Sequence, residues 1–155
     1  MRYALALVAA VLAIVPSIHC QSVAIGYPPA GTTVAPGSNF TVQVDKPNSL
    51  TGSTDVSLII ALHACTTNAS GALACTSPAE EMGTILYSGP YAPQYTNASG
   101  TGEKPPHQNF SVAVPATGFD GVALLSVGHV ALVGAGNSPM FEVVYVDVQV
   151  ASSSD

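Results

Sequence analysis

The stretch Val144-Tyr-Val-Asp-Val-Gln-Val150 places a valine at every second position, with polar or aromatic residues between them. A period of two is typical of a β-strand that buries one face and exposes the other. The stretches Asn39-Phe-Thr-Val-Gln-Val44 and Asn109-Phe-Ser-Val-Ala-Val114 repeat this pattern, with Phe and Val on the buried face and asparagine on the exposed one. These three stretches predict a protein built from antiparallel strands.

Two longer runs, Val56–Ala64 and Val122–Val133, are apolar on both faces and are expected as central strands. Gly128 inside the second run predicts a bulge or a break. The shorter runs Val23–Tyr27 and Thr84–Tyr87 are expected at a sheet edge or at the beginning of the fold. With the Pro, Gly and Asn turns between them, these runs predict an all-β fold, a single immunoglobulin-like antiparallel β-sandwich of about seven strands. Tryptophan is absent, so a true antibody-type domain is not expected.

The beginning of the chain has the pattern of a secretory leader. Arg2 precedes Ala4–Val15, an apolar run too short to cross a membrane. Residues 1–20 are therefore predicted to be a signal peptide. Cleavage after Cys20 is the first choice and cleavage after Ser22 the second, since both side chains are small.

The rest of the chain has the length of one domain, predicted at residues 21–151, followed by a disordered polar tail at 152–155. No apolar run lies near the C-terminal end of the sequence, so neither a lipid-anchor signal nor a membrane-spanning helix is expected there. The predicted location is extracellular.

Removing the leader leaves two cysteines, Cys65 and Cys75. An even number in an oxidising compartment predicts one disulfide, which would contribute about 2–3 kcal/mol for so short a loop. Asn68 is expected at the exposed tip of that loop. After it, Ser77–Glu80 has a capping serine, a first-turn proline and a glutamate at the third position, with Gly83 as terminator, and predicts one helical turn.

Charge is sparse in this chain. Without Arg2, two basic residues remain against nine acidic ones, a net charge of −7. Nucleic acid and anionic membranes are therefore poor partners. Four sites match the acceptor pattern for N-glycosylation, and glycans would keep so weakly charged a chain soluble. The predicted glycosylation sites are Asn39, Asn68, Asn97 and Asn109.

No catalytic or metal-binding pattern stands out. His63, His107 and His129 are far apart in sequence, and a strand-end or core position is expected for each instead of a metal site. The only adjacent acidic pair, Glu80-Glu81, lies in the predicted turn, and a glycosidase needs two carboxylates that face each other. The sequence predicts a protein that is not an enzyme and has no cofactor.

The segment Ser88–Gln108 is a long irregular stretch rich in proline, glycine and serine. Such loops often bind partners, and Tyr91 and Tyr95 could supply the contact area. The alternative is that both tyrosines only pack this loop over a sheet edge, since a glycan on Asn97 would crowd a contact surface.

Several segments resemble the fungal Nis (necrosis-inducing secreted protein) effector family, and together they cover nearly all of the predicted mature chain. They are Gly26-Tyr-Pro-Pro-Ala-Gly31, Pro36-Gly-Ser-Asn-Phe-Thr-Val42, Thr51-Gly-Ser-Thr-Asp-Val56, Met82-Gly-Thr-Ile-Leu-Tyr-Ser-Gly-Pro-Tyr91, Gln108-Asn-Phe-Ser-Val-Ala-Val-Pro115, Gly128-His-Val-Ala-Leu-Val-Gly-Ala135 and the final valine-rich strand.

The resemblance implies a secreted fungal protein that binds receptor-associated immune kinases of plants and suppresses pattern-triggered immunity. It implies no catalytic residues. The cysteine pair and the four acceptor sites favour action outside cells, although delivery into host cells stays open. A second interpretation is a wall-associated immunoglobulin-like glycoprotein that binds wall polysaccharide, for which Tyr91 and Tyr95 would be the aromatic platform.

Overall fold

The computed structural model describes residues 22–96 and 104–152 of the chain. The predicted leader at residues 1–20, the acceptor Asn97 and the last three residues of the predicted tail lie outside the described residues. Ten strands and no helix occur in the described part. In sequence order they are β1 Ala24–Tyr27, β2 Thr32–Val34, β3 Asn39–Asp45, β4 Ser53–Ala64, β5 Thr66–Thr67, β6 Leu73–Ala74, β7 Thr84–Gly89, β8 His107–Ala113, β9 Gly121–Val133 and β10 Ser138–Val150.

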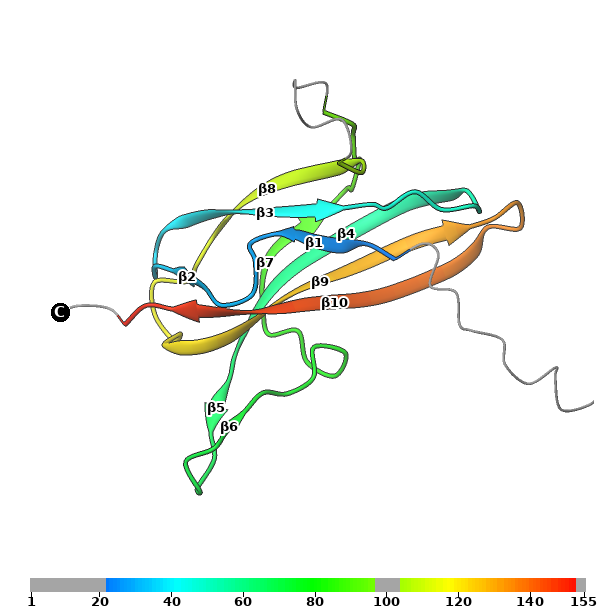
Figure 1. Ribbon diagram of the computed structural model, residues 1–155. Helices are drawn as coiled ribbons and strands as arrows, with labels where there is room; N and C mark the ends of the chain where they lie inside the picture. The colour runs from blue at the N-terminus through cyan, green and yellow to red at the C-terminus, as the bar shows by residue number, and fades with distance from the viewer. Residues whose placement is uncertain (1–21, 97–103, 153–155) are drawn as a thin grey trace, which may run out of the picture.

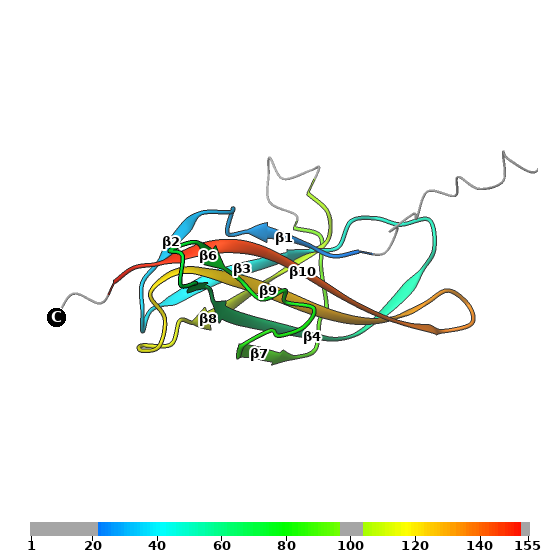
Figure 2. The ribbon, with the colours of Figure 1, turned by 90° about the horizontal axis from the view of Figure 1, so that it is seen from below.

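The strands form two layers, which Figures 1 and 2 show from two directions. One sheet has the order β1-β3-β8, and the other has the order β2-β10-β9-β4-β7. All pairings are antiparallel except that of β2 with β10, which is parallel. A separate hairpin of β5 and β6 projects from the end of β4 (Figure 1). The predicted all-β sandwich is confirmed.

The inner faces of the two sheets form one apolar core. Its buried members are Val23, Val34, Val42, Val44, Leu58, Ile60, Leu62, Tyr91, Phe110, Val112, Val114, Ala123, Leu125, Val127, Val148 and Val150. The alternation of side chains in the sequence therefore corresponds to the inner and outer faces of the strands.

The pairing of β3 with β8 shows how far this alternation holds. Val42 lies opposite Phe110 and both are buried, while the acceptors Asn39 and Asn109 are exposed, as predicted. Gln43 is an exception, because it is buried although the pattern places it on the wet face. Its side chain donates to Asp45 at 2.5 Å and accepts from the Lys104 ammonium at 2.8 Å, so the loop before β8 covers it.

The predicted bulge or break at Gly128 is wrong. Strand β9 pairs with β4 and β10 without interruption at Gly128, which lies between Ile59 and Val143. A Cβ at this position would lie 3.3 Å from the Met82 methyl and 3.4 Å from the Phe141 ring, so these two side chains pack closely over the glycine. The irregularities in the sheet fall elsewhere, at Asp55/Ser57 and at Ile60/Ala61 of β4.

The predicted single helical turn is present as an isolated hydrogen-bonded turn that does not continue into a helix. The backbone N–H groups of Glu80 and Glu81 both donate to the Ser77 carbonyl, at 2.8 and 3.0 Å. The chain then straightens, and Gly83 has a positive φ of 80°, as expected of a terminator. A single turn of so few residues does not continue as a helix, because helix nucleation is unfavourable.

Candidate functional site

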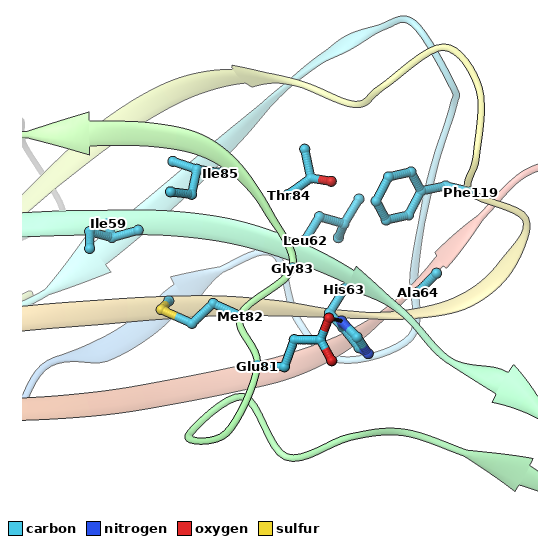
Figure 3. Close-up of a pocket in the computed structure, with 10 residues that line it drawn as sticks. All are labelled: Ile59, Leu62, His63, Ala64, Glu81, Met82, Gly83, Thr84, Ile85 and Phe119. Carbon is cyan, nitrogen blue, oxygen red and sulfur yellow. Dashed lines mark ion pairs between the residues drawn. The ribbon is translucent and has the colours of Figure 1, made fainter.

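A groove opens on the five-stranded sheet where β4, β7 and the loop before β7 meet (Figure 3). Its volume is about 590 Å³. It is lined by Ile59, Leu62, His63, Ala64, Glu81, Met82, Gly83, Thr84, Ile85 and Phe119. The lining is mostly apolar, with one imidazole and one carboxylate on its rim, and this composition is typical of a binding site.

The disulfide and Gly83 hold the loop that forms one wall of the groove. Cys65 and Cys75 are bonded, with a Cα–Cα distance of 4.4 Å, so the predicted disulfide is confirmed. It closes the β5–β6 hairpin immediately after β4 and returns the chain toward that strand. A Cβ at Gly83 would lie 2.5 Å from the Leu62 carbonyl oxygen, so only glycine allows the loop to approach β4 this closely.

Among the residues that line the groove, only His63 and Glu81 are ionisable, and both lie on its rim. The Nδ1 atom of His63 lies 4.0 Å from an Oε atom of Glu81 (Figure 3). Glu81 is largely exposed, and this distance is at the limit of an ion pair. The arrangement offers an apolar slot beside a carboxylate, so it fits an apolar side chain next to a positive charge.

A second cluster of charges lies between the sheets and involves His129. Its imidazole is fully buried. Nε2 lies 3.0 Å from Asp55 Oδ1, and Nδ1 lies 3.0 Å from Glu142 Oε1. A carboxylate can only accept, so both ring nitrogens donate and His129 is an imidazolium. The two carboxylates are on opposite sides of the ring and cannot converge on one ion.

Three further groups complete this cluster. The Lys46 ammonium donates to Asp55 Oδ2 at 2.6 Å. The Val23 backbone N–H and the Ser22 hydroxyl donate to Glu142, at 2.9 and 2.5 Å. The cluster therefore ties the segment before β1 and the end of β3 to the opposite sheet.

A bulge in β4 directs Asp55 inward. In β4, Leu58, Ile60 and Leu62 face the core, so a regular strand would place residue 55 outside. The register with β9 shifts between Asp55 and Ser57. The extra residue, Val56, is exposed, and Asp55 meets the buried His129. A bulge of this kind redirects one side chain while the ladder continues.

The contacts set the ionisation of the cluster. Burial alone would lower the pKa of His129, but the hydrogen bonds and negative charges of Asp55 and Glu142 outweigh it and raise that pKa above 6.5. Burial alone would raise the pKa of Asp55, yet the bonds from His129 and Lys46 lower it. Burial would likewise raise the pKa of Glu142, and the bonds from His129, Ser22 and Val23 lower it.

The sequence predicted a strand-end or core position for His129, and the structure places it in the core, but its charged partners were not predicted. The only available signal was Glu142, which falls on the buried side of the strand when the alternation of Val144 and Val146 is extended backward. A carboxylate in that position needs a buried partner. The other two histidines of the described residues lie apart from this cluster: His63 is on the groove rim, and buried His107 has its Nδ1 2.9 Å from the Pro105 carbonyl.

The tyrosines predicted as a partner-binding loop separate in the structure. Tyr91 is 4% exposed, donates its hydroxyl to the Val44 carbonyl at 3.1 Å and packs edge-on against His129. It cannot reach a partner, because its ring fills the core. Tyr95 is 60% exposed and donates to Asn48 Oδ1 at 2.9 Å. Of the predicted pair, only Tyr95 is available to contact a wall polysaccharide, and a single ring offers a small contact area.

The described acceptor sites are all accessible. Asn39 and Asn109 are exposed on the outer face of the three-stranded sheet. Asn68 is exposed in the turn of the β5–β6 hairpin, where its Oδ1 accepts from the Ser70 hydroxyl at 2.7 Å. The predicted glycosylation of these sites stays a prediction.

The described residues contain neither a metal-binding cluster nor a membrane-spanning helix. Across residues 22–96 and 104–152, no group of three or more His, Cys, Asp or Glu side chains could hold a metal ion. In the same part of the chain, no helix is both long and apolar enough to cross a membrane.

Comparison with known proteins gives one match that covers most of the chain. The family model described as the Nis1 family matches residues 21–149. No curated protein matches. Among solved structures, the chain is similar to a cellulose-active polysaccharide monooxygenase from M. thermophila, with a TM-score of 0.44 and 14% identity. That match covers 81% of this chain and 55% of the monooxygenase, so the chain spans about half of its length, and a likeness this distant supports no functional argument.

Proposed function

The chain belongs to the Nis1 family, and from that membership we propose that it is a secreted, effector-like glycoprotein that acts by binding a host protein. The family match over residues 21–149 is the observation that carries this proposal. The Nis1 family is not a family of enzymes, which supports a role in binding instead of catalysis. The Cys65–Cys75 disulfide agrees with secretion, because disulfides persist in oxidising compartments.

The proposed partner is a receptor-associated immune kinase of a plant, and the proposed consequence is suppression of pattern-triggered immunity. The kinase partner and the immune suppression are proposed because segments such as Gly26–Gly31 and Gln108–Pro115 resemble the fungal necrosis-inducing secreted effectors. The predicted net charge of −7 suits a partner with a basic surface. Extracellular action is proposed first, because a disulfide and glycans are features of proteins outside the cytosol.

The groove beside the disulfide hairpin is the proposed contact site. Ile85 lies on its wall and is exposed, and Glu81 supplies a negative charge on the rim. An apolar side chain of the partner would enter the groove, and a neighbouring lysine or arginine would approach Glu81. Apolar anchors of this kind carry most of the free energy of binding at interfaces.

Co-precipitation from plant tissue tests the proposal. The secreted protein is expected to capture immune kinases and to reduce the oxidative burst that follows a microbial elicitor. Ile85→Asp should lose both effects, since it places a charge in the apolar wall. Leu50→Asp is the matched control, because Leu50 is fully exposed outside the groove.

Two results would count against the proposal in different ways. Absence of kinase capture and of immune suppression by the unaltered protein would reject the effector function. Equal capture by both variants would keep the function and reject the groove as its site.

A further inference from the structure

Strand β10 has one side that is only partly paired. It pairs with β9 along its whole length, but with β2 only over Val148–Val150. Within the described part of the chain, no strand pairs with the rest of that side. In Figure 1, β10 follows the lower margin of the five-stranded sheet.

The direction of the free backbone groups follows from two hydrogen bonds. The Gly31 N–H donates to the Asp147 carbonyl at 3.0 Å, and the Ala151 N–H donates to the Val34 carbonyl at 2.9 Å. Residues 147 and 151 thus point their backbone groups toward β2. The register of β10 with β9 has no shift. The backbone N–H and C=O groups of the alternate residues Phe141, Val143 and Tyr145 therefore point toward the same side of β10, which is unpaired along this segment.

The free segment has limits that are symmetric about Val143. At one end, Pro139 has no N–H to donate. At the other end, the Asp147 carbonyl already accepts from Gly31. Three usable residues remain between these limits, with Val143 in the middle. An antiparallel strand of the same sequence would place Val143 opposite itself and Phe141 opposite Tyr145, and every free N–H and C=O would be paired.

The side chains on this segment favour the same pairing. Phe141 is 61% exposed and Tyr145 is 57% exposed, and cross-strand aromatic pairs stabilise antiparallel sheets. The nearest charge, Glu142, is directed inward and bonded to His129. The free segment of β10 has no lysine, bulge or glycan acceptor. Of the features that keep exposed edges apart, Pro139 and Asp147 lie at its two ends, and the inward-directed Glu142 is paired with His129.

We propose that two copies of this chain pair antiparallel through β10, centred on Val143, and join their five-stranded sheets into one continuous sheet. The occupant of the edge is a second copy, because the symmetric limits of the free segment leave no unmatched backbone group when it pairs with itself. Formation of this dimer does not depend on which host partner the protein binds.

Sedimentation equilibrium of the secreted protein at about 0.15 M salt tests the pairing, since that salt concentration screens the negative charge of the chain. A concentration-dependent dimer is expected. Val143→Pro should raise its dissociation constant about tenfold or more, because it removes the central N–H from both copies. Proline is tolerated at this position, because that N–H makes no bond within the sheet. A protein that stays monomeric, or a dimer that Val143→Pro leaves unchanged, would overturn the proposal.

The register has its own test, which depends on charge and not on proline. In the variant F141K/Y145K, lysine would face lysine, and the dimer should be lost. In F141K/Y145E, each lysine would face a glutamate of the other copy, and the dimer should return. Near-identical thermal unfolding of both variants would show that folding is unaffected. Loss of the dimer in F141K/Y145E as well, or its persistence in F141K/Y145K, would reject the β10 register and leave a different contact between copies or another occupant of the edge.

Discussion

Replacing His129 with leucine should destabilise the fold by about 3 kcal/mol, because it leaves two nearly buried carboxylates without their shared cation. The general range for removing one partner of a buried ion pair is about 3–5 kcal/mol. The low end applies here, since each carboxylate keeps another partner. Asp55 retains the Lys46 ammonium at 2.6 Å, and Glu142 retains the Val23 N–H at 2.9 Å.

The pH dependence of stability identifies the cause of this loss. The pKa of His129 is raised, so its contribution is complete below its unfolded value of 6.5 and is lost as pH rises through the folded pKa. The pKa values of Asp55 and Glu142 are lowered, so their contributions are present above 3.8 and 4.5 and are lost as pH falls. The unaltered protein should therefore be most stable between these limits, and it should weaken above pH 6.5.

Urea unfolding at a series of pH values measures both effects. The free energy of unfolding from linear extrapolation should differ most between His129→Leu and the unaltered protein near pH 5.5–6, between the unfolded pKa values quoted above, and the difference should shrink at alkaline pH. His107→Leu is the matched control, because His107 is also buried but its Nδ1 contacts a backbone carbonyl. It should leave the alkaline weakening in place.

A third variant separates charge from packing. Asp55→Asn and Glu142→Gln, added to His129→Leu, remove the unpaired charges and should recover part of the lost stability. If His129→Leu costs less than about 1 kcal/mol, or if the alkaline weakening persists in it, the buried imidazolium is not what holds this end of the sandwich.

Three shorter predictions concern the groove loop, the disulfide and the glycans. Gly83→Ala should lower the free energy of unfolding by about 1–3 kcal/mol, since φ is 80° and a Cβ would meet the Leu62 carbonyl at 2.5 Å; urea titration measures it, and an unchanged midpoint would contradict it. Cys65→Ser with Cys75→Ser should cost about 2–3 kcal/mol, and a reducing agent should match that loss in the unaltered protein. Asn39→Gln and Asn109→Gln should each increase electrophoretic mobility by one glycan, and unchanged mobility would show that the site is unoccupied.

The strands could be predicted from the sequence because their signal is local. A period of two over Asn39–Val44 or Val144–Val150 reports which face is buried without knowledge of the neighbouring strand. Local signals also predicted the exposure of Asn39 and the short loop closed by the two cysteines. Short strands without alternation carry no such signal. The parallel pairing of Thr32–Val34 with β10 was therefore not predicted.

The residues that form the buried charge cluster around His129 come from distant parts of the chain. Asp55 and His129 meet only because a bulge shifts β4 by one residue, and no residue near Val56 marks that bulge. Tyr91 was read as a loop residue because its neighbours are prolines, yet the loop folds inward and its ring reaches the core. Local composition cannot report a contact with Val44, which lies 47 residues earlier in the sequence.

Salt concentration should act in opposite directions on the two proposed surfaces. After Arg2, Lys46 and Lys104 are the only lysine or arginine residues in the sequence; Lys46 is bonded to Asp55, and Lys104 to Gln43. Negative charge therefore dominates the surface, so a basic host partner is attracted and two copies of the chain repel each other. Raising salt from about 0.05 to 0.5 M shortens the screening length, so capture of the partner should weaken while the β10 dimer tightens. If both associations respond to salt in the same direction, the charge argument fails for one of the two surfaces, and the Ile85→Asp and Val143→Pro variants would show which.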